Sequence, residues 1–187
     1  MSACPKRPKG DRSVFHVVVE SPGTPYWLHV EADAKAMLRD VDHFLRGIWL
    51  ECCGHLSAFT IQGNRYTSHP EGMEDPGLEI PLKKVFTPGQ KIVYEYDFGS
   101  TTELSVRVLS EGKGPGEDPP IRLLARNDPP SFSCLECGKP AMLVCTQCAS
   151  SEEAALCQKC AQEHECGEEM ALPLVNSPRA GVCGYTG

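Results

Sequence analysis

The residues of this chain whose types and spacing suit chemistry are cysteines and histidines concentrated in its last third. The sequence has 11 cysteines among 187 residues, and eight of them follow residue 133. Three Cys-x-x-Cys pairs precede one His-x-Cys pair, which gives the ligand set Cys134, Cys137, Cys145, Cys148, Cys157, Cys160, His164 and Cys166. A Cys-x-x-Cys turn places two sulfur atoms at two corners of a tetrahedron with metal–sulfur bonds of about 2.3 Å. The set therefore predicts two zinc ions, both structural, because no corner is left open for water.

Four ligand pairs can close two sites in two ways. In a sequential arrangement, the first two pairs bind one ion and the last two pairs bind the other. In a cross-brace arrangement, the first and third pairs share one ion, and the second and fourth pairs share the other. We favour the cross-brace, because the seven residues between Cys137 and Cys145 suit a short hairpin at residues 139–144 that separates the sites. Interleaving also lets the metals replace a hydrophobic core that so short a segment cannot build.

Cys183 is a ninth candidate for the eight ligand positions. It lies in Gly-Val-Cys-Gly, which also has the form of a ligand turn, and it could replace Cys166 in the second site. We place Cys166 first because it is close to His164 in the sequence.

A third cysteine-rich stretch lies in the first part of the chain. His55 follows Cys52 and Cys53, which raises the question of another metal site. Adjacent cysteines do not readily present both sulfurs to one tetrahedron, so two ions remain the expectation. A disulfide framework would accompany a secretion signal, and none is visible, so we expect a cytoplasmic protein with reduced cysteines.

The ligand spacing resembles the cross-brace zinc modules of the MYND, B-box and AN-one types. The final His-x-Cys pair is most similar to the AN-one type. The resemblance covers residues 134–166 and implies a zinc-finger surface that binds peptides or proteins. The third and fourth pairs depart from the MYND pattern, so the partner specificity of MYND modules is not implied.

The hydrophobic pattern predicts an α+β domain over residues 13–126. Alternating or β-branched segments predict strands at residues 13–20, 26–31, 55–62, 91–97, 103–109 and 121–125. Apolar residues at three- and four-residue spacing predict one main helix at residues 33–48, with Asp33 as its N-cap. We expect an antiparallel sheet with that helix packed on it.

Flanking segments complete the expected domain organisation. Residues 1–12 form a mobile lead, residues 127–133 a linker, and residues 134–187 the zinc module with its C-terminal tail. The tail around residues 172–179 could pack on the zinc module or on the larger domain.

Two segments of the larger domain carry a second resemblance. His55-Leu-Ser-Ala-Phe-Thr-Ile61 and Tyr94-Glu-Tyr-Asp-Phe-Gly-Ser-Thr-Thr-Glu-Leu104, with Tyr66, resemble the plasmid pRiA4b open-reading-frame-three-like family. The resemblance covers roughly residues 13–126. It implies a compact α+β fold found in plasmid and mobile-element contexts, without an established biochemical activity.

Several polar residues of the family pattern are replaced in this chain. The second histidine of the family's first strand falls on Ser57. The Asp, Trp and His that follow the family's glycine fall on Ser100, Thr102 and Leu104.

The polar residues left for a site in this domain are His55, Asp97 and Glu103. Strand alternation places Glu95 and Asp97 on a solvated acidic edge, and Gly99 is expected to supply the special backbone angle of the following turn.

Charge and motif content rank three functions. The net charge is -7, and residues 131–187 hold three Lys/Arg and seven Asp/Glu, which opposes binding to a phosphate backbone. The leading hypothesis is a non-enzymatic zinc-containing adaptor that binds proteins. The alternatives are a nucleic-acid-binding accessory protein, using Lys83, Lys84, Lys91 and Arg107, and an enzyme using the residual site. The sequence contains no Gly-rich phosphate loop, no nucleophile elbow, no His-Glu-x-x-His pair and no apolar run of membrane-spanning length.

Overall fold

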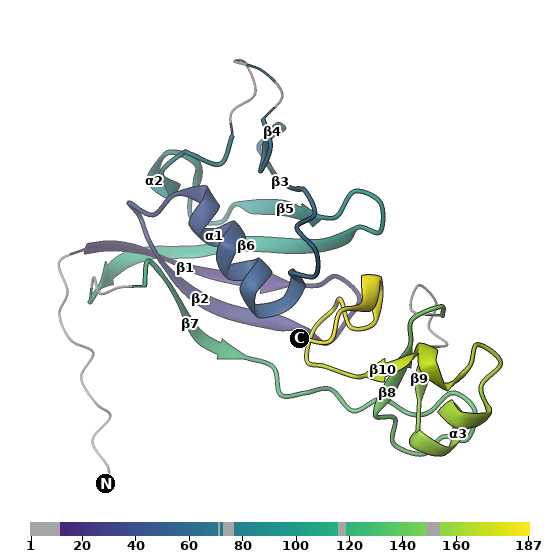
Figure 1. Cartoon of the computed structure of the whole chain (residues 1–187). Helices are drawn as coiled ribbons and strands as arrows, with labels where there is room; N and C mark the ends of the chain where they lie inside the picture. The colour runs from purple at the N-terminus through teal and green to yellow at the C-terminus, as the bar shows by residue number, and fades with distance from the viewer. Residues whose placement is uncertain (1–11, 71, 73–76, 116–118, 149–153) are drawn as a thin grey trace, which may run out of the picture.

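The computed structural model describes residues 12–70, 72, 77–115, 119–148 and 154–187. Within these residues, seven strands form one sheet in the order β4-β3-β5-β6-β1-β2-β7, and every neighbouring pair is antiparallel. A second sheet of three short strands, in the order β10-β8-β9, lies at one end of the first (Figure 1). The fold is α+β and mostly sheet.

The large sheet follows the predicted strands, with additions. Its strands are β1 (Arg12–Glu20), β2 (Trp27–Asp33), β3 (Ser57–Ile61), β4 (Asn64–Thr67), β5 (Lys91–Tyr96), β6 (Thr102–Gly114) and β7 (Ile121–Arg126). The first two strands, β1 and β2, pair as an antiparallel hairpin. β4 was not predicted, and β6 runs to Gly114, past the predicted end at residue 109, because residues 110–114 pair with the start of β1.

The main helix begins later than its apolar periodicity predicts. α1 (Leu38–Leu45) continues into the π-helix η1 (Arg46–Leu50), and Asp33 ends β2 instead of capping the helix. The intervening backbone pairs elsewhere: the amide of Leu38 donates to Ile80 at 2.9 Å, and Ala36 accepts from the amide of Leu82 at 2.8 Å. α2 (Leu82–Val85) is a single extra turn. Among the helices of the described ranges, none is long and apolar enough to span a membrane.

The core lies between the large sheet and the helix that crosses one of its faces (Figure 1). Alternation along β5 buries Ile92, Tyr94 and Tyr96 completely, and the helix adds Leu45 and Trp49, also fully buried. Packing the helix here places its C-terminal end, and the cysteines that follow, beside the end of β5.

The cysteine-rich module has little regular structure. It contains β8 (Leu143–Cys145), β9 (Ala155–Leu156), β10 (Ala171–Pro173), α3 (Gln158–Glu163) and the 3-10 turns η2 (Glu168–Met170) and η3 (Val182–Gly184). The predicted hairpin at residues 139–144 is wrong: β8 pairs with β9 and β10, which come later in the chain.

The C-terminal tail realises both alternatives left by the sequence: β10 pairs with β8 of the module, and the residues that follow pack on the larger domain. The Ser177 hydroxyl donates to the carbonyl of Trp49 at 2.6 Å. Asn176 and Asn127 bond reciprocally: the Asn127 amide donates to the Asn176 side-chain oxygen at 2.8 Å, and the Asn176 amide donates to the Asn127 carbonyl at 3.1 Å. These hydrogen bonds hold Asn127, the first residue of the predicted linker, against the tail.

Candidate metal centres

The described residues contain three groups of Cys and His whose ligand atoms all lie within 4.8 Å of one another. They are Cys134, Cys137, Cys157 and Cys160; Cys145, Cys148, His164 and Cys166; and Cys52, Cys53, His55 and Cys183. All ten described cysteines belong to one of these groups. Cys4 lies outside the described residues.

The first group combines the first and third Cys-x-x-Cys pairs. Cys157 immediately precedes α3, and the helix carries Cys160 on its first turn. The Cys137 and Cys157 sulfurs are 3.6 Å apart. A tetrahedral site with metal–sulfur bonds of about 2.3 Å has sulfur–sulfur edges of about 3.8 Å. The observed separation therefore suits a metal ion.

The second group combines the second Cys-x-x-Cys pair with the His-x-Cys pair. Cys145 ends β8, and Cys148 follows in the next turn. The Cys148 sulfur lies 3.7 Å from His164 Nε2 and 3.8 Å from the Cys166 sulfur. These separations also fit the edges of a tetrahedral site.

The two groups of the module are interleaved along the chain, in the arrangement that we favoured from the spacing. Each group takes ligands from segments on both sides of β9, so one ion would connect the parts of the module that precede and follow this strand. The apolar residues buried beside the ligands are few, with Leu156 and Ala161 fully buried. Metal coordination can thus supply the cohesion that this small core lacks.

Backbone amides face the buried ligand sulfurs. Burial alone would raise the pKa of Cys134, but hydrogen bonds from the backbone of Cys157 and Cys137 lower that pKa to about 6. In the same way, the backbone of Cys148 outweighs burial and lowers the pKa of Cys145 to about 7. Amides directed at sulfur favour the thiolate, which is the form that binds metal.

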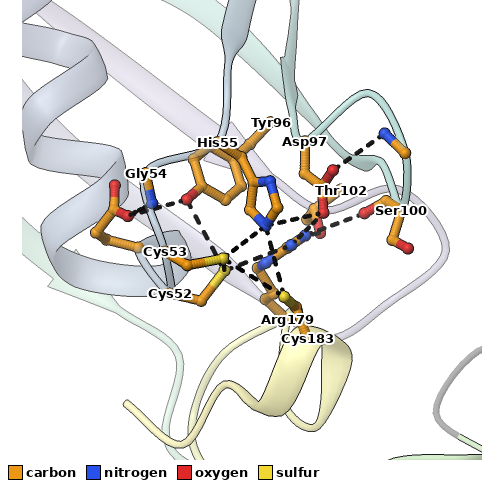
Figure 2. Close-up of polar contacts among 12 residues, drawn as sticks. Cys52, Cys53, Gly54, His55, Tyr96, Asp97, Ser100, Thr102, Arg179 and Cys183 are labelled. Atoms are coloured by element: carbon orange, nitrogen blue, oxygen red, sulfur yellow. Dashed lines mark hydrogen bonds and ion pairs between the residues drawn. The ribbon is translucent and has the colours of Figure 1, made fainter.

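The third group was not expected from the sequence. Cys52, Cys53 and His55 lie in the loop after η1, and Cys183 lies in the C-terminal turn η3, so the side chains converge from distant parts of the chain (Figure 2). Cys183 therefore sits with the larger domain, whereas Cys166 joins the second group. The sequence signals were local: His55 follows Cys52 and Cys53, and both segments contain a cysteine followed by glycine.

The three residues of the possible residual site are not gathered together. His55 Nε2 lies 3.5 Å from the carboxylate of Asp97, so these two are neighbours. Glu103 lies on β6 opposite Glu95, with its side chain exposed to solvent.

Asp97 is buried, and the expectation of a solvated acidic edge is wrong for this residue. Its backbone has a φ of 63°, so Asp97, and not Gly99, supplies the left-handed angle of the turn. Arg179 from the tail covers it, with a guanidinium nitrogen 2.5 Å from the carboxylate. Burial would raise the pKa of Asp97, but the bonds from Arg179 and from the Gly99 amide lower it.

Sequence reasoning did not find Arg179. This side chain is completely buried and also donates to the Ser100 carbonyl and to the Thr102 hydroxyl, each at 3.0 Å. Its guanidinium carbon lies 4.9 Å from the centre of the Tyr96 ring (Figure 2). Ser100 and Thr102 thus hold the tail.

Ser57 belongs to a buried network beside the helix. Its hydroxyl donates to Asp42 at 2.6 Å and accepts from Arg46 at 2.9 Å. Tyr94 donates to the same Asp42 oxygen at 2.8 Å. Every member of the network has a partner, so the network anchors the helix to the sheet.

The basic residues considered for nucleic-acid binding lie in two places. Lys83 and Lys84 are exposed on α2. Lys91 and Arg107 are opposite each other on β5 and β6, and Arg107 forms an ion pair with Glu20 at 3.1 Å.

Comparisons with known proteins support the fold and leave the function open. The chain matches no protein-family model and no curated protein. Among solved structures, it is similar to a protein of unknown function, MM3350 from Methanosarcina mazei Go1, with a TM-score of 0.53 and 17% identity, over 62% of this chain and 69% of that one. At this identity, the likeness shows the fold alone. The fold and sites define an antiparallel-sheet α+β protein with Cys/His groups that could hold metal ions.

Proposed function

We propose that this protein is a non-enzymatic adaptor in which two structural zinc ions shape a C-terminal module that binds a partner protein. One observation carries the proposal: each group of the module supplies four Cys/His ligands from two separate pairs. Four protein ligands complete a tetrahedral zinc site and leave no position for a substrate. Sulfur-rich tetrahedral sets favour zinc over harder cations.

The surface of the module supports protein binding. Leu135 is 49% exposed and borders a cleft of about 560 Å³, whose wall includes Glu136, Glu163 and Glu165. An exposed apolar side chain among carboxylates suits a partner segment that combines an apolar anchor with Lys or Arg. The same acidic surface disfavours nucleic acid.

The first test is the metal content of protein purified without added zinc, measured by mass spectrometry of the metals. Zinc bound by the module is expected, and a module that folds without metal would overturn the proposal.

The second test is affinity purification from native cytoplasm, comparing the wild type with Leu135→Glu. The matched control is Leu109→Glu, because Leu109 is similarly exposed, at 41%, but lies on β6. Proteins retained by the wild type and the control but lost with Leu135→Glu would be the partners. If nothing is enriched, or if the two variants behave alike, the module is not the interaction surface.

A further inference from the structure

The cluster of Cys52, Cys53, His55 and Cys183 has the geometry of a metal site. The Cys53 sulfur lies 3.7 Å from the Cys52 sulfur and 3.6 Å from the Cys183 sulfur, and the Cys183 sulfur lies 3.5 Å from His55 Nε2. These values repeat the separations of 3.6 to 3.8 Å in the two groups of the module. Cys53 and His55 are closer, at 2.9 Å, and an ion between them would widen that contact.

The structure also answers the objection that adjacent cysteines cannot share a tetrahedron. The sulfurs of Cys52 and Cys53 lie at the length expected of one tetrahedral edge, about 3.8 Å for metal–sulfur bonds of about 2.3 Å. Gly54 directly follows with a φ of 78°, which reverses the chain and returns His55 to the same point.

The backbone at the third group repeats a feature of the other two. Gly138 follows Cys137 with a φ of 69°, and Gly167 follows Cys166 with a φ of 88°. At the third group, Gly54 and Gly184 follow their cysteines with φ of 78° and 71°. A glycine with positive φ after cysteine turns the chain around the sulfur, so the third group is built in the same way as the others.

Cys183 itself has an unfavourable backbone conformation. Its φ is 51°, and it lies between Gly181 at 78° and Gly184 at 71°. A left-handed conformation is unfavourable for an L-residue that carries a Cβ atom, and such strain gathers at ligand sites. Here the conformation directs the sulfur to Cys53 and His55.

Polar side chains surround the group and can stabilise thiolate ligands. A guanidinium nitrogen of Arg179 lies 3.6 Å from the Cys52 sulfur, and the Tyr96 hydroxyl lies 3.9 Å from it (Figure 2). Outer hydrogen bonds of this kind orient ligand sulfurs and favour their charged form.

We propose that Cys52, Cys53, His55 and Cys183 bind a third zinc ion, which fastens the C-terminal turn to the larger domain. Binding converts the three thiols to thiolates and releases their protons to solvent. Cys53 and Cys183 are 130 residues apart, so the ion closes a long chain segment in addition to the hydrogen bonds that hold the tail. The expected total becomes three zinc ions instead of two.

The third ion is the one that a chelator removes first. Cys53 and Cys183 are exposed, and Cys183 also borders an open cleft of about 710 Å³. The first group, in contrast, buries Cys134 and Cys157, and the second buries Cys145.

The test measures zinc per full-length chain in the wild type, in Cys183→Ser and in the control Cys4→Ser, which keeps all twelve Cys and His residues of the three groups. We expect a loss of one zinc ion per chain in Cys183→Ser and none in the control. Equal zinc in all three proteins overturns the third site. The difference between the two proteins reports on the third site independently of the module. Two zinc ions in both the wild type and Cys183→Ser overturn the third site and leave the proposed function standing. One zinc ion in the wild type and none in Cys183→Ser keeps the third site and removes the zinc basis of the proposed function.

A second measurement uses the wild type alone, in case Cys183→Ser fails to fold. Native protein is alkylated with iodoacetamide while a chelator is titrated, and the modified peptides are identified by mass spectrometry. Cys53 and Cys183 are expected to be protected in zinc-loaded protein and to become alkylated as the first zinc ion leaves. Alkylation that does not depend on zinc overturns the proposal, and so does a Cys53–Cys183 or Cys52–Cys53 disulfide in the purified protein.

Discussion

The ion pair between Arg179 and Asp97 is expected to be the main electrostatic fastening of the C-terminal tail. The Arg179 side chain is fully buried, that of Asp97 is 8% exposed, and their charged atoms are 2.5 Å apart. Arg179→Met keeps most of the side-chain volume but leaves the Asp97 carboxylate buried without its cation. Breaking a buried pair in this way costs about 3–5 kcal/mol. For a chain of this length, that corresponds to a fall in Tm of roughly 10 °C.

The assay is guanidinium unfolding followed by far-UV circular dichroism, with every protein saturated with zinc. Arg107→Met is the matched control, because the Arg107–Glu20 pair has a similar separation of 3.1 Å but side chains that are 46% and 42% exposed. An exposed pair contributes about 1 kcal/mol or less. Adding Asp97→Asn to Arg179→Met is expected to recover stability, because the buried charge is then gone. If Arg179→Met loses no more stability than Arg107→Met, the Arg179–Asp97 pair does not hold the tail as proposed, and the reasoning is refuted.

Three further predictions concern other parts of the molecule. Tyr94→Phe removes a donor to the buried Asp42 carboxylate and should lower the free energy of unfolding by about 1–3 kcal/mol; an unchanged guanidinium midpoint would contradict this. The lowered pKa of Asp97 means that its stabilising effect is complete above its ordinary pKa of 3.8 and is lost as pH falls through the lower folded value. The difference in unfolding free energy between wild type and Asp97→Asn should therefore shrink in that acidic range, and a pH-independent difference would count against the ion pair. Cys160→Ser should lower the zinc content by at least one ion while the circular dichroism of the large sheet persists, and unchanged zinc would exclude Cys160 as a ligand.

Errors in the sequence prediction follow a common cause. The apolar stripe at residues 33–48 is real, but the backbone before Leu38 bonds to the segment around Ile80 and cannot also be helical. β6 extends past its apolar alternation because β1 is available to pair with residues 110–114. In both cases, a distant segment competes for the same amides and carbonyls, and local periodicity does not contain that information.

Asp97 shows the same limit for a candidate site residue. Its position in the alternation predicts exposure, and its left-handed backbone redirects the side chain. Its burial depends on Arg179, which reaches it from 82 residues away.

The sequence by itself determined the features that depend on neighbours within a few residues. Cys-x-x-Cys spacing defines which sulfurs can share a tetrahedral edge, and alternation along residues 91–96 defines which side chains of β5 enter the core. Only the tertiary structure decided where the tail packs and that Cys183 joins Cys53, since contacts across 130 residues depend on how the sheet, the helix and the module are assembled. Short-range geometry is fixed by bond lengths and turn angles, whereas a long-range encounter is the outcome of the whole fold.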